Sequence, residues 1–151
     1  MSEKTIAVSG GFDPMHVGHL RMIKEAAKHG KLTVILNTDE WLLRKKGYVF
    51  MSWDERAEII ETYDFVERVV PARDEDKTVV ESLKELKPDI FANGGDRKNE
   101  NTPEVKYCKE NNIEMMWNVG GGKVQSSSTM VNNATQTKRK KDLEKFRSFT
   151  L

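Results

Sequence analysis

Two histidines three residues apart, His16 and His19, are the side chains with the clearest chemical potential in this sequence. They follow a short apolar run that ends in Gly10-Gly11, and they open a stretch with helical periodicity. A spacing of i, i+3 places both imidazoles on one face of the helix entrance, where the N-terminus carries partial positive charge. Adjacent glycines let backbone N–H groups approach an anion closely. This arrangement suits a phosphoryl group that gains negative charge in its transition state.

Other interpretations of the two histidines are less well supported. A zinc site is disfavoured because Cys108 is the only cysteine, and the third histidine, His29, lies at the far end of the expected helix. We therefore expect no metal centre held by the protein. Taken alone, a His-x-x-His pair more often represents two hydrogen-bonded histidines in a turn. The functional interpretation therefore depends on the surrounding sequence.

Apolar runs alternate with amphipathic stretches along the whole chain. Apolar patterns predict strands over 6–8, 32–36, 65–70, 89–92 and 113–119, and a period of 3.6 residues predicts helices over 17–29, 53–63, 77–86, 103–111 and 126–133. We expect Gly30 to end the first helix in a left-handed conformation, and Ser52 to form a capping box with Glu55. The alternation predicts an α/β, doubly wound, Rossmann-like fold: a five-stranded parallel sheet with helices on both faces. Ligands on such sheets bind beyond the carboxyl ends of the strands, where the histidine motif lies.

Length and charge restrict the organisation of the protein and its partners. The 151 residues suit one domain, expected over 1–136, followed by a charged C-terminal tail or helix over 137–151. A net charge of +1 gives no general attraction to nucleic acid or anionic membrane, so we expect neither as a partner. No apolar run approaches the roughly 20 residues that span a bilayer, and the polar N-terminus is unlike a signal peptide. We expect a cytoplasmic homodimer.

The string from Gly11 to His19 resembles the His-x-Gly-His signature of the nucleotidyltransferase superfamily. These cytidylyltransferase-like proteins include phosphocholine, glycerol-3-phosphate and heptose-phosphate nucleotidylyltransferases. The string follows an expected strand and opens an expected helix, as in the family, and the resemblance extends over nearly the whole chain. It implies an enzyme that binds ATP or CTP with Mg²⁺, transfers the nucleotidyl group to a phosphorylated small molecule and releases pyrophosphate.

The resemblance also implies roles for individual residues, each with a structural alternative. The lysines of 44–47 are expected in a loop that folds over the outer phosphates, or are simply solvated. Arg56 would contact phosphate or pair with glutamates of its own helix. The segment 94–96 would contact the nucleoside or form a tight turn, and Ser126 would hold phosphate or only cap its helix. The expected catalytic residues are His16, His19 and Lys46, the expected nucleotide-binding residues are Gly10, Gly11, Phe12, Asp13, Gly18, Arg56, Gly95, Asp96, Ser126, Ser127 and Ser128, and the expected acceptor-binding residues are Asp39 and Lys123.

Two segments bear on the choice of nucleotide. Residues 87–96 resemble the heptose 1-phosphate adenylyltransferases, and residues 120–125 lack the arginine that the cytidylyl branch carries. Both observations favour adenylyl transfer to a sugar 1-phosphate. Cytidylyl transfer to glycerol 3-phosphate or a similar phospho-alcohol is the alternative within the same class. An alternative from another class is a nucleotide-binding regulator without catalytic activity.

Overall fold

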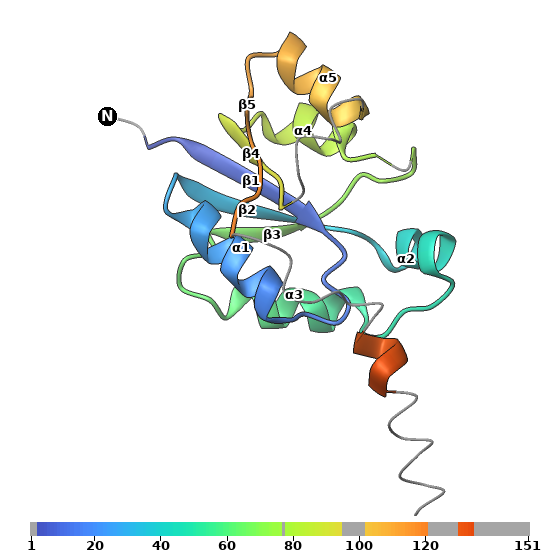
Figure 1. The fold of residues 1–151 in the computed structure, drawn as a ribbon. Coiled ribbons are helices and arrows are strands. Elements are labelled where there is room, and N and C mark those ends of the chain that lie inside the picture. Colours follow the sequence, from blue (N-terminus) through green and yellow to red (C-terminus); the bar gives the residue numbers. More distant parts are fainter. Residues whose placement is uncertain (1–2, 77, 95–101, 121–129, 135–151) are drawn as a thin grey trace, which may run out of the picture.

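The computed structural model describes residues 3–76, 78–94, 102–120 and 130–134. Strands and helices alternate along these ranges (Figure 1). In chain order the elements are β1 (Thr5–Gly10), α1 (Val17–Ala27), β2 (Lys31–Leu36), α2 (Asp39–Lys46), α3 (Trp53–Glu61), β3 (Arg68–Pro71), α4 (Val80–Leu86), β4 (Ile90–Ala92), α5 (Pro103–Glu110) and β5 (Glu114–Met116). A helical turn at 130–134 follows.

The five strands form one sheet in the order β3-β2-β1-β4-β5, and every neighbouring pair is parallel. Alternate residues of β1 enter two separate hydrophobic cores. Ile6 and Val8 pack in one core with Ile23 of α1, whereas Ala7 packs in the other with Leu83 of α4 and Cys108 of α5. Helices α1 and α3 accordingly cover one face of the sheet and α4 and α5 the other (Figure 1). The predicted doubly wound, Rossmann-like architecture is confirmed.

The strand order reverses direction between β1 and β4, which are neighbours in the sheet although far apart in sequence. From β1 the chain winds outward through β2 to β3, and from β4 it winds the other way to β5. The helices that follow β1 and β4, α1 and α5, pack in different cores on opposite faces of the sheet, and such a switch point leaves room for a ligand beyond the strand ends. The loop after β1 carries His16 and His19.

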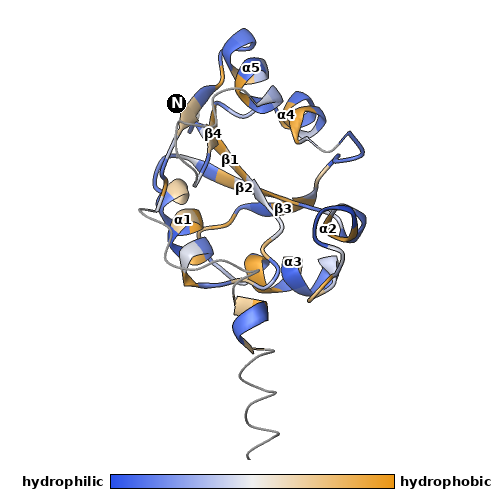
Figure 2. Ribbon diagram, turned by 45° about the vertical axis from the view of Figure 1, so that its right-hand side comes forward, coloured by the Kyte–Doolittle hydropathy of each residue, from blue (hydrophilic) through white to orange (hydrophobic). Residues whose placement is uncertain are grey.

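Helix α2 is an element that the sequence pattern did not predict. Residues 44–47, expected to form a loop, are its last turn and its C-cap, with Gly47 in the left-handed conformation (φ 82°). Thr38 caps the start by accepting a hydrogen bond from the Trp41 N–H. Of its eight residues only Leu42 is buried, so there is no apolar period to detect. Most of α2 is accordingly hydrophilic, in contrast to the largely hydrophobic β1 (Figure 2).

Gly30 does not end helix α1 in the way the sequence suggested. The helix ends at Ala27, and its C-cap Lys28 is right-handed (φ −71°). Gly30 is required for a different reason: a Cβ there would lie 2.5 Å from the carbonyl oxygen of Lys4. The glycine allows β1 and β2 to begin side by side.

Several other elements begin later or end earlier than predicted. The third strand covers 68–71 rather than 65–70, the fifth covers 114–116 rather than 113–119, and the helix expected over 77–86 begins at Val80. Ser52 does accept a hydrogen bond from the Glu55 N–H, as one half of the predicted capping box requires. The start of the helix expected over 126–133, and the tail expected over 137–151, lie outside the described residues. Within the described ranges, no helix is long and apolar enough to cross a membrane.

The packing of α5 on the sheet can be tested through Cys108. This side chain is fully buried in the second core, and burial raises the pKa of its thiol to about 11. We predict that the native protein at pH 8 reacts with a thiolate-directed reagent at least about 100-fold more slowly than the protein unfolded in guanidinium, because the thiol is neutral and shielded. Equal labelling rates for the native and unfolded protein would contradict this packing.

Candidate active site

The loop after β1 holds its conformation through Phe12. This residue has a positive φ (49°) and a buried side chain, and its ring stands edge-on to His19, with 4.8 Å between ring centroids. The ring also lies against Gly10, where a Cβ would be 3.0 Å from its Cζ. Phe12 therefore supports the His19 imidazole from inside the protein. Because the side chain is buried, the nucleotide contact expected for Phe12 would come from its backbone.

The two histidines cap helix α1 reciprocally. His16 is the N-cap, and its Nδ1 accepts hydrogen bonds from the N–H groups of Gly18 (3.0 Å) and His19 (3.4 Å). In return the Nδ1 of His19 accepts from the His16 N–H (3.2 Å). The rings stack with 3.6 Å between centroids and 19° between planes. A neutral imidazole that accepts through Nδ1 carries its proton on Nε2, so the cap makes each Nε2 a hydrogen-bond donor.

Asp13 ties the histidine loop to the segment after α2. The residue is fully buried, and its two carboxylate oxygens accept from the N–H groups of Phe50 and Met51, each at 2.6 Å. Both oxygens are thus engaged by the protein itself. The expected role of Asp13 in nucleotide binding remains a prediction, and the structure gives it a clear local role in holding residues 50–51 beside the loop.

Lys46, at the last position of α2, lies within electrostatic reach of the same loop. Its side chain is partly buried, and desolvation lowers the pKa of its ammonium. The negative charge of Asp13 opposes this shift, whereas the positive charges of Lys45 and Arg56 add to it. Lys45 points elsewhere, since its ammonium lies 4.7 Å from the centroid of the Trp41 ring. Of the two lysines, Lys46 is therefore the one whose environment connects it to the histidine loop.

Arg56 of α3 lies beneath the loops rather than on the outside of its helix. It is almost completely buried and donates to the carbonyl oxygens of Met51 (2.9 Å), Gly11 (2.8 Å) and Asn37 (2.9 Å). Its remaining contact is an ion pair with Asp39 at 2.6 Å. Asp39 is partly exposed, with a side-chain accessibility of 43%. The phosphate contact expected for Arg56 and the acceptor contact expected for Asp39 remain predictions.

A third buried charge, Asp74, was not identified from the sequence. Its carboxylate accepts from the Thr38 N–H (3.0 Å), the Thr38 hydroxyl (3.0 Å) and the Asn37 amide (3.3 Å). Arg44 donates to the Asp74 carbonyl oxygen (3.0 Å). These bonds join the carboxyl ends of β2 and β3 and fix the start of α2. The available signal was an aspartate that follows a strand, but its partners lie 30 or more residues away in sequence.

Backbone hydrogen bonds join the segments that follow β4 and β5. Asn93 donates from its N–H to the Met116 carbonyl (2.8 Å) and accepts from the Val119 N–H (3.2 Å). Gly120 has a positive φ (87°), and a Cβ there would lie 2.7 Å from the Met22 backbone nitrogen, so this segment lies directly against α1. The remaining expected site residues, Gly95, Asp96, Lys123, Ser126, Ser127 and Ser128, lie outside the described residues.

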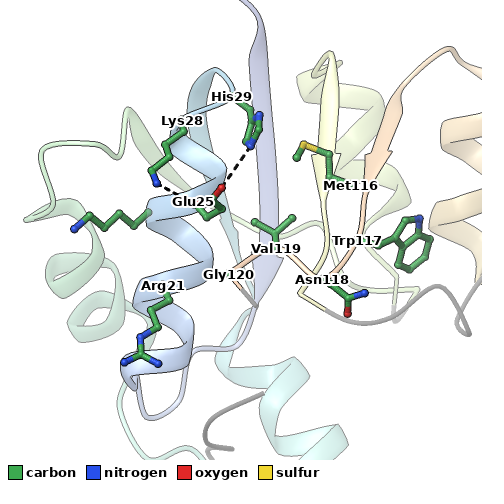
Figure 3. A pocket seen from close by; sticks show the side chains of 10 residues that line it. Arg21, Glu25, Lys28, His29, Met116, Trp117, Asn118, Val119 and Gly120 are labelled. Atoms are coloured by element: carbon green, nitrogen blue, oxygen red, sulfur yellow. Dashed lines mark ion pairs between the residues drawn. The ribbon is translucent and has the colours of Figure 1, made fainter. Parts of the chain in front are cut away.

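A separate cavity of about 530 Å³ lies between α1 and residues 116–120 (Figure 3). It is lined by residues between Arg21 and His29 and by residues 116–120. Glu25 forms ion pairs there with Lys28 (3.1 Å) and His29 (3.9 Å). None of the histidine-loop residues lines this cavity. Among the described residues, no group of three or more histidines, cysteines or acidic residues is arranged to hold a metal ion.

Comparison with known proteins identifies relatives over most of the chain. A family model described as Cytidylyltransferase-like matches residues 7–133. The "Bifunctional protein HldE" of Syntrophotalea carbinolica is 38% identical over 111 residues, which are 71% of this chain and 21% of that protein. The glycerol-3-phosphate cytidylyltransferase of Bacillus spizizenii is 30% identical over 70% of this chain and 82% of its own length. The FAD synthase of Pyrococcus abyssi is 35% identical over 61% of this chain and 63% of its own length.

The matched region thus spans about a fifth of the length of the HldE protein. Among solved structures, the lipopolysaccharide core biosynthesis protein of Thermoplasma volcanium superimposes with a TM-score of 0.63 at 23% identity, covering 77% of this chain and 96% of the other. A putative nicotinate-nucleotide adenylyltransferase of Vibrio parahaemolyticus gives a TM-score of 0.55 at 17% identity, covering 87% of this chain and 86% of the other. These two similarities support the fold.

The histidine cap predicts an unusual response to Gly18→Ala. A Cβ at Gly18 would lie 2.9 Å from Cε1 and 3.1 Å from Nδ1 of His16, so the ring must shift, and we expect the shift to break the capping hydrogen bonds. Replacing glycine in a helix normally stabilises a protein by about 0.5–1 kcal/mol. Here we predict destabilisation by about 1 kcal/mol, because the lost cap outweighs the gain in helix propensity. Denaturant unfolding measures the difference, with Val17→Ala at the neighbouring exposed position as control. A more stable Gly18→Ala variant would show that the cap is not formed.

Proposed function

Because the chain belongs to the cytidylyltransferase-like family, a family of nucleotidyltransferases, we propose that it transfers a nucleotidyl group from ATP or CTP to a phosphorylated small molecule. The observation that carries this proposal is the reciprocal cap of His16 and His19. It presents two Nε2 donors at the N-terminus of α1, beside the switch point of the sheet. Paired neutral donors at a helix N-terminus suit phosphate oxygens.

In the proposed reaction, an oxygen of the acceptor phosphate attacks the α-phosphorus of the nucleoside triphosphate. The bond from the α-phosphorus to the oxygen that bridges to the β-phosphorus breaks, and pyrophosphate leaves. The acceptor phosphate is already ionised at neutral pH, so the step needs no strong general base. Catalysis then consists of positioning and stabilisation of charge. His16 and His19 would donate to oxygens of the α- and β-phosphates as their negative charge grows.

The outer phosphates would be bound by Lys46 and by the serines of 126–128. Lys46 is suited to this task because its partly buried ammonium interacts electrostatically with Asp13, a residue of the histidine loop. The carboxylates near the histidine loop already have protein partners: both oxygens of Asp13 accept from backbone N–H groups, and Asp39 pairs with Arg56. This arrangement fits a metal ion that arrives bound to the nucleotide. Mg²⁺ would be coordinated mainly by phosphate oxygens and water, and it would neutralise triphosphate charge.

For the substrates, we favour adenylyl transfer to a sugar 1-phosphate. This choice is supported by the resemblance of residues 87–96 to heptose 1-phosphate adenylyltransferases and by the match to HldE proteins. Cytidylyl transfer to glycerol 3-phosphate or a similar phospho-alcohol is the second candidate. It is favoured by the match to a glycerol-3-phosphate cytidylyltransferase over 82% of the length of that protein. We also propose that the enzyme is a homodimer, as light scattering would test.

A pyrophosphate-release screen tests the proposed function. ATP and CTP, each with Mg²⁺, are combined with a panel of sugar 1-phosphates and phospho-alcohols. We expect release that depends on both the nucleotide and one class of acceptor, with ATP and a sugar 1-phosphate giving the highest kcat/KM. Preference for CTP would overturn only the adenylyl assignment. Tight nucleotide binding without turnover against any acceptor would support the regulator instead of the enzyme.

His19→Ala tests the role of the capped imidazoles. We predict that turnover falls by a factor of about 10² or more, the usual effect of losing one preorganised donor to a transition state, while the protein remains folded. His29→Ala, which removes an exposed imidazole at the other end of α1, serves as the control and should retain full turnover. Near-normal pyrophosphate release by His19→Ala would refute the assignment of His19.

Lys46→Ala tests the contact with the outer phosphates. We predict that affinity for the triphosphate falls about tenfold or more, while affinity for the monophosphate changes little, because only the triphosphate reaches the ammonium. Calorimetric titration with both ligands measures the difference. Lys84→Ala is the matched control, since Lys84 is an exposed lysine on α4. Equal losses for the two ligands would place Lys46 away from the β- and γ-phosphates.

A further inference from the structure

Arg56 joins three segments that meet at the carboxyl edge of the sheet. Its Nε–H donates to the carbonyl of Met51, just before α3, and Nη1 donates to the carbonyls of Gly11 after β1 and Asn37 after β2. Nη2 completes the set with its bond to Asp39. The planar guanidinium therefore uses donors on all three of its nitrogens, in diverging directions. A lysine in this place would offer three donors from a single atom and could not span the same acceptors.

Arg56 and Asp13 together form a ring of hydrogen bonds that joins residues 11–13 of the histidine loop to residues 50–51. Asp13 holds the N–H groups of Phe50 and Met51, and Arg56 holds the carbonyl of Met51 together with the carbonyl of Gly11. The loop after β1 and the segment after α2 are thereby joined twice, once through N–H groups and once through carbonyls. Lys46 precedes this segment by four residues. The position of Lys46 relative to the two imidazoles consequently depends on the ring.

We propose that Arg56 is a positioning residue, which fixes the histidine loop and the end of α2 relative to each other without touching the nucleotide. This inference rests on the proposed function in one respect: the histidine loop and Lys46, which Arg56 would position, are the proposed phosphate-binding groups. The guanidinium is almost completely buried, and its charge is balanced by Asp39 at 2.6 Å. This role differs from the phosphate contact that the resemblance implies for Arg56. The two roles predict different behaviour for the same substitution.

Arg56→Lys separates the two roles in the kinetics. A positioning residue acts through other side chains, here the two imidazoles and Lys46, which would bind the charge that develops in the transition state. Misplacement of such groups by about 1 Å can reduce the rate by about 10². We therefore expect kcat to fall about 10²-fold while KM for the triphosphate changes less than about threefold. A direct phosphate contact would be partly retained by the lysine charge, and its weakening would appear mainly in KM. A purely structural role would change neither constant for the folded fraction.

Hydrogen exchange of the nucleotide-free protein provides a readout that does not require turnover. In Arg56→Lys we expect the amides of Phe50 and Met51 to lose protection by about tenfold or more, with unchanged exchange in the core strand β2. If this variant does not fold, Asp39→Asn carries the exchange test, because it retains an oxygen acceptor for Nη2 but removes the balancing charge. Arg73→Lys is the matched control, since Arg73 pairs with Glu85 where both side chains are 60% exposed.

The proposal is overturned if Arg56→Lys leaves the exchange of residues 50–51 unchanged, or if the variant raises KM for the triphosphate at constant kcat. It is supported by a loss of protection together with a loss of kcat. A wild-type protein with no turnover against any acceptor would refute the proposed function, and the exchange experiment would still decide whether Arg56 holds the two segments together.

Discussion

The reciprocal hydrogen bonds between His16 and His19 are the constraint on which the rest of the site depends. Each imidazole satisfies a backbone donor that the first turn of α1 would otherwise leave without a partner, and each thereby places its own proton on the outer nitrogen. Gly18 leaves space for the first ring, and Phe12 supports the second. Capping is performed by the Nδ1 atoms, and in the proposed function phosphate oxygens would accept from the Nε2 atoms of the same side chains. The same pair of residues would then stabilise the helix and bind the substrate.

Around this cap, buried charges hold the loops at the carboxyl edge of the sheet. Asp13, Arg56 and Asp74 are each less than 5% exposed, and each is paired with backbone groups from segments distant in sequence. Leaving such groups without partners is costly, so each network strongly favours one arrangement of the loops. Preorganisation of this kind matters for transfer from a triphosphate, because the proposed reaction relies on placement of charge rather than on a strong base.

The fold and the histidine motif could be predicted from local sequence patterns. Most other features of the candidate site depend on contacts between segments that are far apart in sequence. Alternating apolar runs were sufficient for the doubly wound sheet, and the string around His16 was sufficient for the family. Helix α2 was missed because only Leu42 is buried. Arg56 has charged neighbours on its helix and so resembled a surface residue. Its burial depends on carbonyls of residues 11, 37 and 51, and no pattern within one helix can report contacts to three separate segments.

The tautomeric state of the two imidazoles tests the reciprocal histidine cap most directly. Nitrogen-15 NMR of the ligand-free protein at about pH 8.5, where imidazoles are neutral, reports which ring nitrogen carries the proton. His29, which lies outside the site, serves as an internal reference. The reciprocal cap predicts that His16 and His19 both have a protonated Nε2 and an Nδ1 that only accepts. A proton on Nδ1 of either ring would contradict the cap, and with it the proposed presentation of two donors to the phosphates.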